Sequence, residues 1–234
     1  MARLARLALG GFPHLVVQRS VSRPLLLGDG EAARLLDTLR DATIECAVAL
    51  HGYALTPHGL CLLVTPAEGS GIGRAMQFIG RRYVRWINDR RGEHGGLFAG
   101  RYRATLLEPE DGVLEALRYI EWQPVTAGLA NAPEEYRWSS CRHHLGLATD
   151  PGVQVHSLYW ALGNTPFERQ AAYRVWLQGG IAVDRVAQFE QTLAGGWVFG
   201  SADFVRQIEH LCARRPRRAR AGRPRRSPAR EIAP

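Results

Sequence analysis

Residues 46–66 read CAVALHGYALTPHGLCLLVTP, two apolar runs separated at Thr56-Pro57. Each run is short, rich in Val and Leu, and bounded by residues that favour turns, which is typical of β-strands. The spacing predicts one strand over residues 46–55 and a second over residues 60–65. The two expected strands are separated only by the break at Thr56-Pro57.

Strands and helices alternate on both sides of this pair. Residues 14–19 (HLVVQR) have the composition of a strand, and Leu35, Leu36 and Leu39 have helical spacing within residues 31–43. Further along, we expect a helix over 72–90, a strand over 97–107 and a helix over 112–122 that Pro124 stops. The order β-α-β-β-α-β-α predicts an α+β fold, an antiparallel sheet covered by helices on the ferredoxin-like or split βαβ plan.

The composition changes after Trp138. Four short helical stretches are expected over residues 157–162, 166–178, 182–193 and 201–213, separated by GN, GG and GG. The chain is therefore interpreted as a main domain over residues 1–147, a small helical annex over 148–213 and a tail over 214–234. The tail is rich in Pro and Arg and poor in apolar residues, so we expect it to be disordered.

Charge is concentrated in that tail. All 30 basic residues are arginine, and nine of them lie between Arg214 and Arg230. Of the 22 acids only Glu231 lies after residue 213, so residues 1–213 hold 30 − 9 = 21 arginines and 22 − 1 = 21 acids.

Four cysteines without a CxxC pair fit reduced thiols. No apolar run approaches the roughly 20 residues that span a bilayer. We therefore expect a cytoplasmic protein with no membrane partner.

Several motifs together resemble one family. GFPHLVVQRS (11–20), YALTPHGLCLLV (53–64), GGLFAGRYRATLLE (95–108), LRYIEWQPVTAGL (117–129) and WSSCRHHLG (138–146) occur in the order found in the REP-associated tyrosine transposases, within the single-tyrosine HUH transposases. The resemblance covers about residues 10–147. It implies a protein of DNA transposition and recombination that nicks and rejoins single-stranded DNA at hairpin repeats, through a tyrosine nucleophile and a divalent metal, Mg²⁺ or Mn²⁺.

The resemblance also assigns the residues of the site. It places the nucleophile at Tyr119 and a metal ligand at Gln123, one helical turn later. Where the family carries two metal-binding histidines on a strand, the alignment places Gly59 and Cys61. Glycine offers no ligand, and a thiolate suits hard Mg²⁺ poorly. The alternative interpretation makes Tyr119 a core aromatic beside Trp122 and Cys61 a buried, inert thiol.

Candidate DNA contacts lie in three places. The helix expected over 72–91 carries six arginines with Tyr83 and Trp86 between them, and Arg101 and Arg103 alternate on one strand. In the tail, AGRPRR resembles an AT-hook through Arg223 and Arg225. A solvated helix face above core aromatics, and a merely solubilising tail, are the alternatives. The six arginines are Arg74, Arg81, Arg82, Arg85, Arg90 and Arg91.

Two classes of function follow from these residues. The first is a metal-dependent enzyme that nicks single-stranded or hairpin DNA through Tyr119. The second is a non-catalytic, domesticated or decayed DNA-binding protein on the same scaffold, because Gly59 and Cys61 leave the metal site incomplete. DNA is the expected partner in both cases, and a homodimer is a further possibility. RNA binding by an open sheet is less favoured, because no strand carries an RNP-like pair of aromatic residues.

Overall fold

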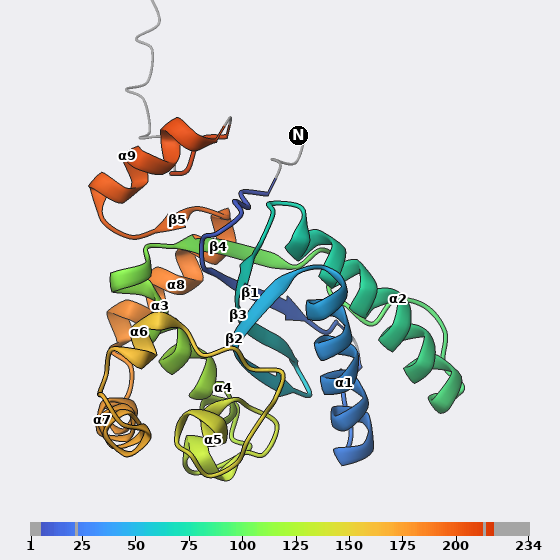
Figure 1. Ribbon diagram of the computed structural model, residues 1–234. Helices are drawn as coiled ribbons and strands as arrows, with labels where there is room; N and C mark the ends of the chain where they lie inside the picture. Colours follow the sequence, from blue (N-terminus) through green and yellow to red (C-terminus); the bar gives the residue numbers. More distant parts are fainter. Residues whose placement is uncertain (1–5, 22, 213, 218–234) are drawn as a thin grey trace, which may run out of the picture.

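The computed structural model describes residues 6–21, 23–212 and 214–217, which form a five-stranded sheet with helices on both faces (Figure 1). The strand order is β2-β3-β1-β4-β5. The first four strands pair antiparallel, and β5 pairs parallel with β4. Their bounds are His14–Arg19 (β1), Val48–Thr56 (β2), Gly59–Pro66 (β3), Arg103–Leu107 (β4) and Val198–Phe199 (β5).

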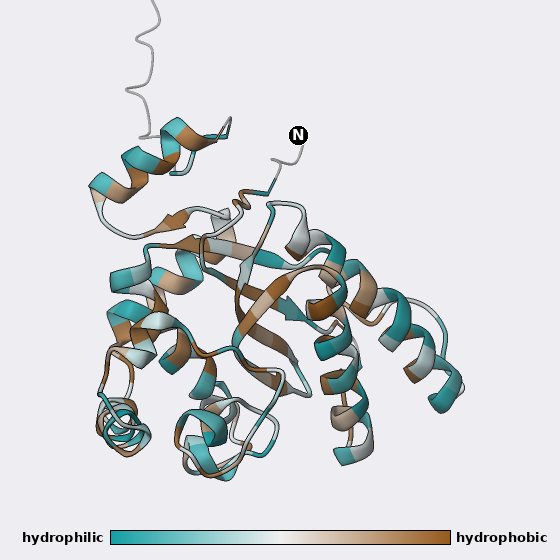
Figure 2. Ribbon diagram, viewed as in Figure 1, coloured by the Kyte–Doolittle hydropathy of each residue, from teal (hydrophilic) through white to brown (hydrophobic). Residues whose placement is uncertain are grey.

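The two faces of the sheet bury different helices. On one face, α1 (Asp29–Glu45) and α2 (Gly71–Arg91) pack over Val16 and Leu62. On the other, α3 (Pro109–Glu121) packs over Leu15 and Leu63. Consecutive strand residues point to opposite faces, so the apolar runs predicted as strands bury both faces at once. Figure 2 shows these apolar strands at the centre of the molecule, between helices of mixed polarity.

The predicted fold class is confirmed: strands and helices occur in the expected order, and helices cover the sheet. Two details differ. The strand expected over 97–107 begins only at Arg103, because Gly100 takes a positive φ of 72° and turns the chain before it. The sheet is not wholly antiparallel, because two residues near the C-terminus form β5 at its edge. A strand of two residues has no periodicity to detect.

The C-terminal helices pack onto the same face as α3. Tyr173 of α7 and Phe189 of α8 are fully buried in the cluster that also contains Leu15 and Leu117. The helices of residues 157–195 therefore share their core with the sheet. The helices that follow α3 along the chain are α4 (Gln123–Thr126), α5 (Cys141–His144), α6 (Ser157–Trp160), α7 (Pro166–Gln178), α8 (Val183–Gly195) and α9 (Ala202–Leu211), with a 3₁₀ turn at Pro133–Glu135.

A buried carboxylate connects α3 to these helices. Glu121 is fully buried, and its Oε1 accepts hydrogen bonds from Ser140 Oγ at 2.8 Å and from His144 Nδ1 at 2.6 Å. Its Oε2 accepts a third from the Tyr173 hydroxyl at 2.8 Å. Because an unpaired buried carboxylate is costly, these three donors hold α3, α5 and α7 in one arrangement.

The C-terminal tail starts later than expected. The backbone N–H of Val198 donates to the carbonyl of Pro216 at 2.9 Å, and Pro216 is buried. Arg214 Nη2 donates to the carbonyl of Gly195 at 2.9 Å. The boundary placed before residue 214 was therefore too early, because residues 214–216 pack against β5 and the end of α8. Arg223 and Arg225 lie outside the described residues.

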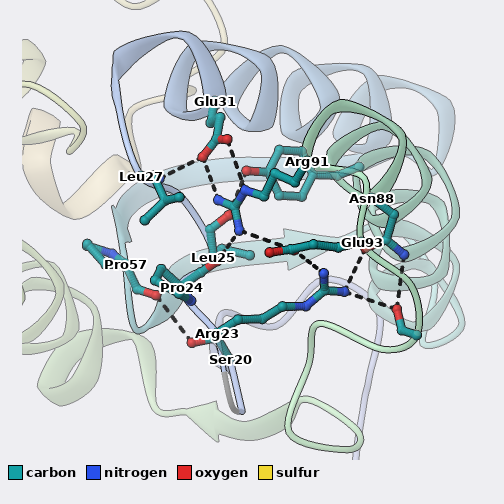
Figure 3. Close-up of polar contacts among 12 residues, drawn as sticks. Ser20, Arg23, Pro24, Leu25, Leu27, Glu31, Pro57, Asn88, Arg91 and Glu93 are labelled. Carbon is teal, nitrogen blue, oxygen red and sulfur yellow. Dashed lines mark hydrogen bonds and ion pairs between the residues drawn. The ribbon is translucent and has the colours of Figure 1, made fainter.

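An ion pair at the C-terminal end of α2 joins three segments (Figure 3). Arg91 donates to both carboxylate oxygens of Glu31, at 3.0 and 2.5 Å, and to the carbonyl of Pro24 at 2.9 Å. Burial favours the neutral acid, but hydrogen bonds from Arg91 and from the N–H of Leu27 hold the pKa of Glu31 below its ordinary value. The resulting stabilisation is complete above the ordinary carboxyl pKa and is lost as the pH falls through the lowered one.

Replacing Arg91 should therefore destabilise the fold. We expect Arg91→Ala to lower the free energy of unfolding by about 3 kcal/mol, because it leaves Glu31 buried without its cation. The control is Arg81→Ala, which removes an exposed arginine of the same helix and should change stability by no more than about 0.5 kcal/mol. Urea denaturation measures both. Equal losses in the two variants would contradict a structural role for the pair.

Candidate nucleic-acid site

A hollow of about 230 Å³ lies on the α3 face of the sheet, where β1 ends and β3 begins. It brings together all four positions that the family resemblance singled out: Gly59, Cys61, Tyr119 and Gln123. Its other lining residues are Val17, Gln18, Arg19, Ala54, Thr56, His58, Leu60, Thr126 and Ala127. The sequence prediction of which residues meet is consistent with this hollow, although their roles in chemistry stay predictions.

Strand register explains the arrangement. Arg19 pairs with Gly59 and Val17 pairs with Cys61, so these four residues share one face of the sheet. Gly59 has a φ of +155°, and a Cβ there would lie 2.3 Å from the carbonyl oxygen of Gln18. Only glycine fits this backbone without a shift of β1 or β3. The position aligned with a family histidine is therefore closed to any side chain.

Tyr119 lies beneath α8. Its side chain is 3% exposed, and its hydroxyl donates to Glu190 Oε1 at 2.7 Å. Burial is the main cause that raises the pKa of Tyr119, and the Glu190 carboxylate adds to it, so the phenol holds its proton near neutral pH. Arg19 Nη2 donates to both oxygens of Glu190, at 3.2 and 3.3 Å. Tyr119, Glu190 and Arg19 are thus linked in sequence by hydrogen bonds.

Glu190 was not predicted from the sequence. It lies 71 positions after Tyr119, in a segment interpreted as a separate annex, and no motif marks it. Arg19 lies inside a family-like motif, but nothing in the strand pattern distinguished it from other arginines. Only the packing of α8 over α3 and β1 brings these two side chains to Tyr119.

The residues around Tyr119 do not fit a divalent metal ion. Burial raises the pKa of the Cys61 thiol well above its ordinary value, so the sulfur stays protonated and is a poor ligand. Gln123 donates through Nε2 to the carbonyl of Tyr119 at 3.2 Å. Within the described ranges, no group of three or more His, Cys, Asp or Glu side chains is placed to hold a metal. Mg²⁺ and Mn²⁺ prefer several carboxylate or imidazole ligands, whereas the described lining residues include one imidazole, His58, and no carboxylate, and the nearby Glu190 is paired with Arg19.

The α2 arginines lie on the other side of the sheet from Tyr119 (Figure 1). Arg82 lies 3.8 Å from Asp41, and Arg85 lies 4.0 Å from Asp89, so both are loosely paired at the surface. Tyr83 is fully buried and donates to the carbonyl of Leu25 at 2.7 Å, so it cannot stack on a base. Arg91 is held in its ion pair with Glu31. Tyr83 is thus a core aromatic, as the alternative interpretation expected, and Arg91 is engaged in the α1–α2 layer, so neither side chain is placed to contact DNA.

Arg101 and Arg103 line a second hollow, next to the first. Arg103 pairs with Val17 in the sheet, so it shares the face that carries Tyr119. Gln18, which lines the first hollow, donates through Nε2 to the carbonyl of Gly100 at 3.3 Å, in the wall of the second. The predicted GRYR contacts are thus on the Tyr119 side of the sheet, away from the α2 arginines.

The fold has a solved counterpart. A REP-associated tyrosine transposase bound to a REP hairpin superposes with a TM-score of 0.53 at 14% sequence identity, and the match covers 67% of this chain and 92% of that one. No family model and no curated protein matches the sequence. The likeness is therefore one of fold. Across the described ranges, no helix is long and apolar enough to cross a membrane.

Because the backbone at Gly59 leaves no room for a side chain, we expect a substitution there to lower stability. We expect Gly59→Ala to lower the free energy of unfolding by about 2 kcal/mol, from the positive φ and the contact with the Gln18 carbonyl. Gly96→Ala is the matched control, because its Cβ would meet open space and should leave stability nearly unchanged. Thermal melts compare the two. A Gly59→Ala protein as stable as the Gly96→Ala protein would show that this position tolerates a side chain.

Proposed function

We propose that this chain is a transposase-like DNA-binding protein that binds single-stranded or hairpin DNA at the hollow beside Tyr119. The observation that carries the proposal is that this one hollow gathers the family-aligned positions together with an exposed guanidinium. The solved transposase with the same fold is itself bound to a DNA hairpin, which supports the proposal.

The chemistry of the hollow suits a nucleic-acid strand. Arg19 is 65% exposed at its edge and can contact a phosphate with a planar, bidentate guanidinium. Val17, Ala54 and Ala127 supply apolar surface, while Thr56 and Gln123 supply hydrogen-bonding groups. An apolar floor with a cation at the rim is the combination that binds bases and backbone of a single strand. Binding of this kind needs no metal ion.

Nicking and rejoining of DNA through Tyr119 is a second candidate. Its support is the hydrogen bond from the Tyr119 hydroxyl to Glu190, a carboxylate within reach of the proton that an attacking phenol must lose. Against it stand the raised pKa and the burial of Tyr119, and the poor fit of the hollow to a metal ion. DNA binding without cleavage needs neither an ionised, accessible Tyr119 nor a metal ion. The geometry therefore supports binding better than cleavage.

Binding should depend on Arg19 and on salt. We expect affinity for a hairpin oligonucleotide with a single-stranded flank to fall steeply between low and moderate salt, because arginine–phosphate contacts release counterions. Arg19→Ala should weaken binding about tenfold at low salt, the effect of one charge-assisted contact. Arg206→Ala, which removes an exposed arginine of α9, is the control and should bind as before. Fluorescence anisotropy measures the affinity of the unaltered protein and of the two variants. Equal affinity of the Arg19 and Arg206 variants would show that the DNA does not bind at the hollow beside Tyr119.

Cleavage is tested separately with a labelled hairpin and Mg²⁺ or Mn²⁺. If a covalent protein–DNA band forms, Tyr119→Phe should abolish it while leaving affinity unchanged, because the variant lacks only the attacking oxygen. A band that persists in the Phe variant would mean that another residue, such as Tyr102, is the nucleophile. Denaturing gels resolve the adduct from free DNA.

A further inference from the structure

A second hollow, of about 350 Å³, lies between the GRYR segment and the C-terminal end of α8. Among the residues that the structure describes, four arginines line it and no acidic residue does. They come from three distant parts of the chain: the N-terminal segment, the turn into β4, and the residues after α9. The lining residues are Arg6, Ala99, Gly100, Arg101, Tyr102, Arg103, Ala104, Leu193, Ala194, Gly195, Gly196 and Arg214.

Two of the four arginines are held in position. Arg6 lies over the ring of Tyr102, with its guanidinium carbon 3.7 Å from the ring centroid, and its Nε donates to the Tyr102 carbonyl. Arg214 donates to the Gly195 carbonyl and lies 5.3 Å from the ring centroid of Trp197. The contacts of Arg6 fix its side chain without neutralising its charge, since an aromatic ring and a carbonyl carry no net charge.

The other two arginines, Arg101 and Arg103, are exposed, and within residues 6–21, 23–212 and 214–217 neither forms an ion pair. Burial, together with the charge of Arg101, lowers the pKa of Arg6, so the hollow crowds like charges. By contrast, Arg40 faces the carboxylate of Asp150 at 2.9 Å. Arg6, Arg101 and Arg103 thus bring three cations to a hollow that has no acid among its described lining residues, and an anion relieves their repulsion, most of all one that carries several charges.

The two hollows adjoin at the end of β1. The backbone N–H of Ala99 donates to the carbonyl of Arg19 at 2.8 Å, and Gln18 contacts Gly100. Helix α8 borders both, with Glu190 at the first and residues 193–196 at the second. A strand that leaves the Tyr119 hollow past Arg19 therefore meets the four arginines next.

We propose that the four-arginine hollow is a second phosphate subsite, which takes the backbone phosphates of the strand that passes Tyr119. This inference rests on the proposed function and adds to it the C-terminal part of the chain as a component of the DNA site. The guanidinium groups of Arg6, Arg101 and Arg103 suit consecutive phosphates of a backbone, since each can contact one phosphate with paired N–H donors. The subsite positions the strand and reads no base.

The test compares two double variants by the salt dependence of hairpin binding with a long single-stranded flank. Arg101→Ala/Arg103→Ala should make the slope of log affinity against log salt shallower by about 1.4, because each phosphate contact on a single strand contributes about 0.7. Arg82→Ala/Arg85→Ala removes the same charge from exposed positions on the other side of the sheet and should leave the slope nearly unchanged. Thermal melts check that both variants fold.

The outcomes separate this inference from the proposed function. If Arg19→Ala weakens binding while the two double variants keep equal slopes, the first hollow binds DNA and the second subsite is refuted. A larger effect in the Arg82/Arg85 variant would move the strand to α2 and refute it too. Absence of DNA binding by the unaltered chain would overturn both proposals.

A free anion could use the same guanidinium groups, so inorganic pyrophosphate is the second probe. If the hollow takes backbone phosphates, pyrophosphate should compete only weakly, and shortening the single-stranded flank should reduce the slope in the unaltered chain but not in Arg101→Ala/Arg103→Ala. Tight pyrophosphate binding that the double variant abolishes, with no dependence on flank length, would assign the hollow to a free anion and overturn the inference.

Discussion

The buried carboxylate of Glu121 is the contact on which the arrangement of the site depends. It accepts hydrogen bonds from Ser140, His144 and Tyr173, which belong to segments that are far apart in sequence. A fully buried carboxylate is tolerated only when its oxygens are satisfied, so the three donors and the acid specify one another's positions. Glu121 stands two residues after Tyr119 on α3. The network that anchors α7 therefore also sets where the following helix, α8, lies over the tyrosine.

That placement gives the Tyr119 hollow its chemical character. With α8 packed over the sheet, Glu190 accepts from the Tyr119 hydroxyl and pairs with Arg19. The two strand positions aligned with metal-binding histidines offer no good ligand, because the backbone at Gly59 excludes a side chain and burial keeps the Cys61 thiol protonated. The result is a site with a cation at its rim and an apolar floor. Such a site is suited to holding a strand, and its basic surface continues past β1 toward Arg101 and Arg103.

The sequence was informative where a pattern is local. Alternation and helical spacing predicted β1, β2, β3 and most helices, and the fold class was confirmed. Tyr119 and Gln123 were expected to meet because they are one helical turn apart, and Gly59 and Cys61 because they alternate on one strand. Glu190 escaped prediction because its role depends on packing between distant segments. Tyr83 was left with two interpretations because its arginine neighbours are exposed, whereas Tyr83 itself continues the buried stripe of Met76, Ile79 and Ile87 under α1.

The central claim is that DNA binds on the Tyr119 side of the sheet, and arginine modification tests it most directly. The protein is treated with an arginine-specific dicarbonyl reagent with and without hairpin DNA, and modified residues are read by peptide mass spectrometry. The account predicts that DNA protects Arg19, Arg101 and Arg103 and leaves Arg82 and Arg85 as reactive as in the free protein. Protection of Arg82 and Arg85 with no change at Arg19, Arg101 and Arg103 would contradict it.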